Sequence, residues 1–201
     1  MVKLQNPYNY TLQELAMINA LLPFTGDSWN RVKHITRQIR EHLITEQNDE
    51  CAYCGLPLKE TSRPEVDHIA ARKVDDARYP EFTFEPQNLA VACSYCNGSS
   101  CKGDKNTIDT YHAQYRNCTF TIVHPYLDDT NLHLSFERNN DSQIIRGLSP
   151  RGIETIRMFK LDSAEKSEAR VKKIKQEQFK NARRKHPRLA TLIERALEFI
   201  S

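Results

Sequence analysis

The sequence predicts an α+β fold in which a small strand-containing core, clasped by two cysteine pairs, lies within a mainly helical frame. The two CxxC pairs are separated by 38 residues. Short apolar runs bounded by turn residues lie beside these pairs and favour strands. Longer segments on both sides carry apolar residues at helical spacing and favour helices. With 201 residues, the chain is long enough for one core of ordinary size with helical extensions.

Two helices are predicted ahead of the first cysteine pair. Thr11 and Glu14 form the capping-box pattern that starts the first helix. The second helix begins at Asp27 or Ser28 and continues to about Gln47. Its apolar residues recur near helical spacing, which predicts one buried face made of Val32, Ile35, Ile39, Leu43 and Ile44.

The cysteine pairs, Cys51 with Cys54 and Cys93 with Cys96, have the spacing of metal-binding knuckles. Four thiolates form the tetrahedral ligand set that suits Zn²⁺, and they leave no open position for water or substrate. We therefore expect a structural zinc ion. Two alternatives are that Cys101 replaces one of the four ligands, or that the cysteines are reduced core residues.

The segment between the two pairs holds the candidate reactive groups. Asp67 and His68 stand side by side in a predicted strand over residues 66–70, and Asn88 directly precedes a second one over residues 89–93. An unperturbed imidazole titrates near pH ~6.5, so His68 is suited to act as a general base. Neighbouring strand residues point to opposite faces, so Asp67 cannot serve the same water and can bind a metal ion instead.

The Asp-His pair, the stretch NLAVACSYCN and the KGDK that follows resemble the HNH nuclease family, between Cys51 and Lys105. This resemblance implies the ββα-metal (His-Me finger) core, a two-stranded hairpin and a helix around one catalytic metal ion. It also implies that Asp67 and Asn97 bind Mg²⁺ or Mn²⁺, and that Asn88 braces the loop and orients the base. Asn97 stands where the family often has histidine, and its amide oxygen can still bind a hard cation.

Four cations near the motif are candidate nucleic-acid contacts. Lys102 and Lys105 lie near an expected short helix after Cys96, where they can hold flanking phosphates. Arg72 and Lys73 follow the first strand closely and can touch DNA. The alternative for all four is an ordinary solvated surface.

The region after the cysteine-rich unit is predicted to add two short strands within residues 119–136. The stretch from His124 to His133 is interpreted as a packed turn that supports the core. A second metal group is its alternative.

Helices dominate the C-terminal part. Ser149 can cap one helix, Asp162 can cap the long basic helix that follows, and Pro187 ends it. A final amphipathic helix is expected over residues 189–200. The chain has a net charge of +3, and residues 170–188 carry nine Lys and Arg against one Glu. The basic helix therefore lies along nucleic acid, or forms a solvated face or a docking surface for a partner.

Together these features predict a metal-dependent HNH endonuclease that hydrolyses DNA phosphodiester bonds. Three segments are expected: residues 1–48 as an N-terminal helical segment, 49–110 as the nuclease core with its four-cysteine zinc site, and 111–201 as a C-terminal supporting segment. The alternatives are a non-catalytic zinc-containing nucleic-acid-binding module, or an effector subunit that a partner holds inactive.

The layout of the whole chain resembles small HNH proteins of bacterial defence systems, the retron-associated and Septu-type nucleases. This resemblance implies a role in antiviral defence, a cytoplasmic location and an SMC/ABC-like ATPase partner. No run of 18 apolar residues is present, so no membrane-spanning helix is expected.

Overall fold

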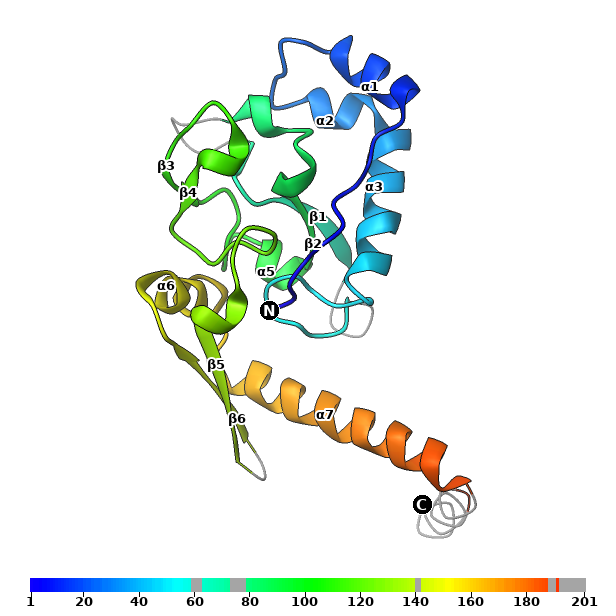
Figure 1. Cartoon of the computed structure of the whole chain (residues 1–201), viewed down its shortest axis with the longest axis vertical. Coiled ribbons are helices and arrows are strands. Elements are labelled where there is room, and N and C mark those ends of the chain that lie inside the picture. Colours follow the sequence, from blue (N-terminus) through cyan, green and yellow to red (C-terminus); the bar gives the residue numbers. More distant parts are fainter. Residues whose placement is uncertain (59–62, 73–78, 140–141, 188–190, 192–201) are drawn as a thin grey trace.

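The computed structural model contains helices and small antiparallel hairpins, which confirms the α+β class (Figure 1). In its described residues the strands form three two-stranded sheets. None of the helices in those residues has the length and apolar character needed to cross a lipid bilayer. The helix expected over residues 189–200 lies outside the described residues except for Thr191. The structure describes residues 1–58, 63–72, 79–139, 142–187 and 191.

Three helices precede the first cysteine pair: α1 (Leu12–Asn19), α2 (Ser28–Arg31) and α3 (Lys33–Glu46). The predicted capping box starts α1. The Thr11 hydroxyl accepts a hydrogen bond from the Glu14 backbone N–H at 3.2 Å, and the Glu14 carboxylate accepts one from the Thr11 backbone N–H at 2.8 Å. Both groups at the helix start are therefore satisfied, as the sequence predicts.

The prediction of one continuous helix to Gln47 is wrong at Val32. This residue leaves the helical region, with φ −121° and ψ 51°, so α2 and α3 are separate helices. The Val32 side chain is buried, as the predicted apolar face requires. Beyond the break, α3 buries one face through Ile35, Ile39 and Leu43, as its spacing predicts.

The two strands predicted around the cysteine-rich insert form one antiparallel hairpin. Strand β1 (Pro64–His68) pairs with β2 (Leu89–Cys93), with Asp67 opposite Ala90 and His68 opposite Leu89. The first strand begins two residues earlier than expected. The segment that joins the strands contains two short 3-10 turns that each start at a proline: η1 (Pro80–Phe82) and η2 (Pro86–Asn88).

The short helix α5 (Ser94–Asn97) directly follows β2. The expectation that a helix follows Cys96 is wrong, because Cys96 lies inside this helix. The Cys93 sulfur caps the helix start by accepting a hydrogen bond from the Cys96 backbone N–H at 3.4 Å. The backbone then becomes extended at Gly98 (φ −73°, ψ 165°), which ends the helix.

The C-terminal half adds two hairpins and two longer helices. Ser149 caps α6 as predicted, by accepting a hydrogen bond from the Gly152 backbone N–H at 3.1 Å. The predicted Asp162 cap of α7 is wrong: Ser163 caps this helix, and Asp162 is exposed. The bounds are β3 (Ile108–Thr110), η3 (Tyr115–Asn117), β4 (Thr119–Phe120), η4 (Thr130–Leu132), β5 (Leu134–Asn139), β6 (Ser142–Gly147), α6 (Pro150–Phe159) and α7 (Ala164–Lys185).

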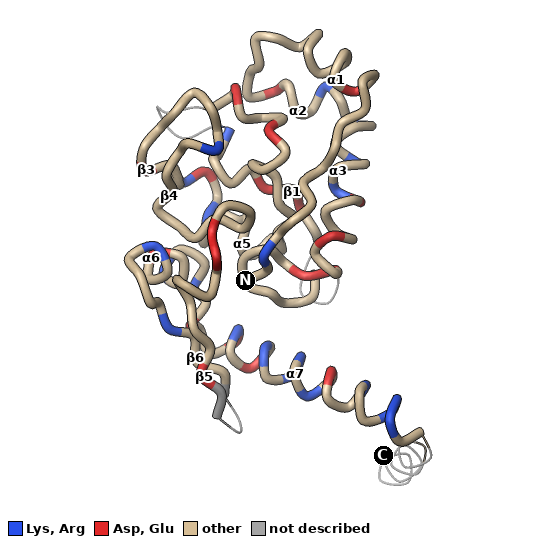
Figure 2. Tube along the Cα trace, viewed as in Figure 1, with Lys and Arg blue, Asp and Glu red and all other residues tan. Residues whose placement is uncertain are grey.

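Helix α7 extends away from the rest of the molecule (Figure 1). Its first half is anchored, because Lys166 and Arg170 are buried. The described residues from 175 to 187 are all exposed. Figure 2 shows Lys and Arg recurring along this helix. The helix therefore has an anchored first half and a projecting, basic second half.

A buried glutamine joins α3 to the central hairpin. The Gln47 side chain donates to the Val91 carbonyl at 2.7 Å and accepts from the Val91 backbone N–H at 2.8 Å. These are the backbone groups of β2 that face away from β1. The side-chain amide thus satisfies the outer edge of the hairpin, which would otherwise carry buried unpaired groups.

Candidate active site

The four predicted zinc ligands come together as a buried cluster. Their sulfur atoms lie within 4.8 Å of one another, and this is the one His/Cys/Asp/Glu cluster of its kind among the described residues. Four thiolates bound at about 2.3 Å from a tetrahedral zinc ion stand roughly 3.8 Å apart, so the residues present fit Zn²⁺. Cys101 is not part of the cluster. The cluster consists of Cys51, Cys54, Cys93 and Cys96.

Helix α7 places two cations beside this cluster, a feature the sequence interpretation missed. The Lys166 ammonium is buried and donates to the Cys96 sulfur at 3.6 Å and to the Phe159 carbonyl. The buried Arg170 guanidinium donates to the Leu161 carbonyl at 2.6 Å and interacts electrostatically with Cys54. Positive charge near thiolates favours their charged form. Lys166, Arg170 and Lys173 share helical spacing, and this pattern was the available signal.

His68 at the end of β1 has a fixed tautomer. Its Nε2 lies 3.0 Å from the Thr83 carbonyl oxygen. A carbonyl can only accept, so Nε2 carries the proton and Nδ1 carries the free lone pair. Burial, assisted by the nearby Arg72 guanidinium, holds the pKa of His68 well below its ordinary value near 6.5. The imidazole is therefore neutral at pH 7, the form that can accept a proton.

Asn88 braces the two loops that hold His68. Its side-chain oxygen accepts from the Ala70 backbone N–H at 2.7 Å, and its nitrogen donates to the Ala70 and Phe82 carbonyls at 3.2 and 2.9 Å. Ala70 follows His68 closely, and Phe82 precedes the residue whose carbonyl orients the imidazole. Asn88 is fully buried. The geometry matches the bracing position expected from the family resemblance, and the functional role itself is a proposal.

A hydrogen-bonded chain supports Asn88 from the C-terminal part. The Tyr115 hydroxyl donates to the Asn88 side-chain oxygen at 2.9 Å and also lies 2.9 Å from His124 Nε2. His124 Nδ1 accepts from the backbone N–H groups of Tyr126 and Leu127, so Nε2 is the donor to Tyr115. His124, Tyr126 and Thr130 are buried, as the packed-turn interpretation expects, and the described residues from His124 to His133 form no metal-type cluster.

Asp67 is buried next to His68 but faces other partners. One carboxylate oxygen accepts from the Lys102 ammonium at 2.8 Å, and the other accepts from the Tyr53 hydroxyl. The Lys102 ammonium also donates to the His68 carbonyl at 2.8 Å. Lys102 is only 1% exposed. The expectation that Lys102 is a surface contact for flanking phosphates is therefore corrected: its charge is used inside the protein, on Asp67.

Asn97 is oriented by Glu65, a residue that the sequence interpretation did not single out. The Asn97 side-chain nitrogen donates to the Glu65 carboxylate at 2.9 Å. Burial alone would raise the pKa of Glu65, but the bonds from Asn97 and Arg63 lower it below its ordinary value. An ionised carboxylate can only accept, so the Asn97 amide oxygen faces away from Glu65. Alternation along β1, with Glu65 and Asp67 two residues apart, was the available signal.

One pocket of about 440 Å³ gathers five of the eight predicted residues outside the cysteine cluster. The carboxylate of Asp67 and the amide oxygen of Asn97 are hard donors that fit Mg²⁺ or Mn²⁺, because each Asp67 oxygen has a second lone pair. The pocket is lined by the predicted Asp67, His68, Arg72, Asn97 and Lys102, together with other residues such as Val66.

The remaining predicted residues lie elsewhere. Asn88 is buried behind His68 and is not part of the pocket lining. Lys105 is exposed, outside the lining, and donates to the Cys101 carbonyl. Lys73 lies outside the described residues. Arg72 donates to the Gly26 carbonyl at 2.8 Å, and its guanidinium stands 6.0 Å from the Trp29 ring.

Comparisons with known proteins agree with this geometry. Residues 51–105 match the family model described as HNH endonuclease. The chain is 28% identical to protein ea31 of Escherichia phage lambda over 92 residues, which are 46% of this chain and 26% of that protein. It is 24% identical to Septu protein PtuB of Bacillus mycoides (strain KBAB4) over 142 residues, which are 64% of this chain and 48% of that protein. The chain thus spans about a quarter and about half of the lengths of these relatives.

Proposed function

We propose that the chain is a metal-dependent endonuclease that hydrolyses phosphodiester bonds in DNA, since residues 51–105 match the HNH endonuclease model. The observation that carries the proposal is the fixed tautomer of His68. Its Nε2 is held by the Thr83 carbonyl, and the imidazole lines the same pocket as Asp67 and Asn97.

In the proposed reaction, His68 Nδ1 removes a proton from a water molecule as the water oxygen attacks phosphorus. A new P–O bond forms, and the bond between phosphorus and the leaving sugar oxygen breaks. Asp67 and Asn97 would hold Mg²⁺ or Mn²⁺, which supplies neutralisation of phosphoryl charge and help for the leaving oxygen when bound. Asn88 keeps the base in place by tying the loops around it. The four-cysteine site, with zinc bound, would hold the domain together.

We propose a defence role from the similarity to Septu protein PtuB. In this proposal the protein works in the bacterial cytoplasm as the nuclease subunit of an antiviral system with an SMC/ABC-like ATPase partner. The division into segments 1–48, 49–110 and 111–201 also remains a proposal.

A partner-gated form of this function is favoured by one specific contact. The Lys102 ammonium lies on a carboxylate oxygen of Asp67, where a positive charge opposes an incoming metal ion. A change that draws Lys102 away would free that oxygen. While Lys102 still pairs with Asp67, isolated protein is expected to be inert although its site is intact.

The test is a cleavage assay with plasmid DNA and Mg²⁺ or Mn²⁺, comparing wild type with His68→Ala. We expect cation-dependent nicking or linearisation that the variant loses, with zinc content unchanged. Cleavage by wild type and variant alike would refute the role of His68. If wild type fails to cut with every cation tested, both alone and with an ATPase partner, while still binding DNA, the non-catalytic zinc-containing module becomes the better description.

A further inference from the structure

A second hollow adjoins the candidate active site. It has a volume of about 640 Å³ and is lined by residues of α2, α3 and β1. Three of its lining residues, Val66, Arg72 and Asn97, also line the active-site pocket. The two hollows therefore adjoin each other, and together they extend from Asp67 and His68 to the exposed face of α3; we call this pair of hollows the groove.

The walls of this second hollow are strongly cationic. Their charged residues are five cations and one acid, Glu65. Three of the cations stand on α3 at helical positions i, i+4 and i+7, on the side opposite the buried Ile35 and Ile39. At a rise of 1.5 Å per residue they span about 10 Å. The five are Lys33, Arg37, Arg40, Arg63 and Arg72.

The ion pairs within the groove leave this charge available. Arg37 pairs with Glu41 at 2.9 Å, but both side chains are more than half exposed. Arg63 pairs with Glu65 at 2.9 Å and is also largely exposed. Exposed pairs of this kind contribute little free energy, so a polyanion can displace them at small cost. The second oxygen of Glu65 is already engaged by Asn97.

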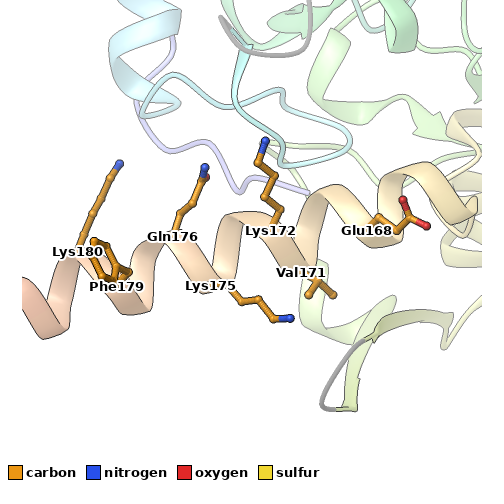
Figure 3. A pocket seen from close by; sticks show the side chains of 7 residues that line it. All are labelled: Glu168, Val171, Lys172, Lys175, Gln176, Phe179 and Lys180. Atoms are coloured by element: carbon orange, nitrogen blue, oxygen red, sulfur yellow. The ribbon is translucent and has the colours of Figure 1, made fainter. Parts of the chain in front are cut away.

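A second basic surface, which runs along α7 from Lys172 to Lys180, fits this task less well. Figure 3 shows Lys172, Gln176 and Lys180 pointing to one side of the helix and Lys175 pointing to another. A hollow of about 700 Å³ lies along these residues, and it shares no lining residue with the active-site pocket. Charge on α7 is therefore spread around the helix and lies apart from the candidate base.

We propose that the groove lined by α3, β1 and Arg72 binds the phosphate backbone of the DNA substrate on one side of the bond to be cut. The inference rests on the proposed function and adds the track that the substrate follows. Duplex DNA carries one charge per about 1.7 Å of its axis, so a 10 Å row of cations faces several phosphates. The contacts are to phosphates and carry no sequence preference.

The test compares two triple variants of the full chain in a His68→Ala background, so that binding is measured without cleavage. The groove variant is Lys33→Gln, Arg37→Gln, Arg40→Gln. The matched control on α7 is Lys172→Gln, Lys175→Gln, Lys180→Gln. All six side chains are exposed, so the fold should persist. Fluorescence anisotropy with a labelled DNA duplex gives the dissociation constant over a series of salt concentrations.

Each lost phosphate contact lowers the slope of log K against log salt by about 0.9, so the groove variant should lose roughly 2–3 units of slope. At moderate salt it should bind about 10- to 100-fold more weakly, whereas the α7 control should change less than about threefold. Equal binding by the groove variant and the parent, a larger loss in the α7 control, or no binding by the parent at low ionic strength would each overturn the inference.

Cleavage by the same triple variants with His68 intact separates this inference from the proposed function. If the parent cuts DNA and the groove variant cuts and binds equally well, the nuclease stands and the groove assignment fails. In the opposite case, wild type never cuts DNA while the groove variant shows the expected loss in the slope of log K against log salt. The groove assignment then stands and the proposed hydrolysis fails.

Discussion

Replacing Asn88 with alanine should unfold the loops around His68 more readily than any exposed substitution. The Asn88 side chain makes four hydrogen bonds, to the backbone N–H and C=O of Ala70, the C=O of Phe82 and the hydroxyl of Tyr115. Each bond contributes about 1 kcal/mol net, and the partners left behind are buried. Four such bonds sum to about 4 kcal/mol. Contacts within one network do not add simply, so the free energy of unfolding should fall by about 3–5 kcal/mol.

The assay is urea unfolding followed by tryptophan fluorescence. Trp29 is the only tryptophan of the chain, and its ring centroid lies 4.7 Å from that of His68 in an edge-on arrangement. With a slope near ~2.5 kcal/mol per molar urea, Asn88→Ala should lower the midpoint by roughly 1.5 M. The change in fluorescence reports on the same loops that Asn88 ties together.

The matched control is Asn30→Ala, which removes an exposed asparagine that donates to Asp27 at 2.9 Å. Its effect should stay within about 0.5 kcal/mol. A loss below about 1 kcal/mol for Asn88→Ala would refute the argument that these hydrogen bonds hold the loops. So would a loss in the control of the same size as in Asn88→Ala.

Three further changes test the zinc cluster, the Asp67 pair and the buried imidazole of the packed turn. Cys54→Ser should lose zinc and unfold the core, seen by metal analysis and circular dichroism; a native spectrum with zinc retained would show that three thiolates suffice. Lys102→Gln should lower the melting temperature by leaving Asp67 without its cation, and Mn²⁺ should raise it more than in wild type. An equal Mn²⁺ shift in both proteins would contradict this. Burial and Arg151 lower the pKa of His124 to about 3, against about 6.5 when unfolded, so stability should fall as pH drops through this window. His124→Gln should reduce the dependence by about 1.4 kcal/mol per pH unit, measured by urea unfolding; identical pH profiles would rule this out.

The chain's sequence predicted the elements whose signals are local. Thr11 and Glu14 start α1 because a capping box needs only residues three apart. The four cysteines form a cluster because the short spacing within each pair places its two sulfur atoms together. Only the approach of the two pairs is a long-range contact. His68 and Asn97 reach one pocket for the same reason, since both lie next to knuckle-bound strands or turns.

The predictions that were wrong depend on long-range contacts in the fold, which a local sequence pattern does not indicate. Val32 is buried as its spacing predicts, but its backbone leaves the helical region there, a break that the periodic pattern does not indicate. The sequence around Lys102 indicates a surface cation, but in the fold Lys102 is buried in an ion pair with Asp67. Lys166 belongs to a lysine-rich helix, yet its ammonium donates a hydrogen bond to the buried Cys96 sulfur. A charged residue gives the same local signal whether it meets water or a buried partner.

The hydrogen bonds around Asn88 determine the shortest fragment of this chain that keeps the contacts supporting His68. The family match ends at Lys105, but the bonds continue to Tyr115 and His124, and the imidazole of His68 is walled by Trp29 from the other direction. A fragment cut to the matched residues would carry the whole recognisable motif and lack both supports. Grafting or trimming this domain therefore has to follow the bracing contacts, and the boundaries of sequence similarity are a poor guide to where the chain can be cut.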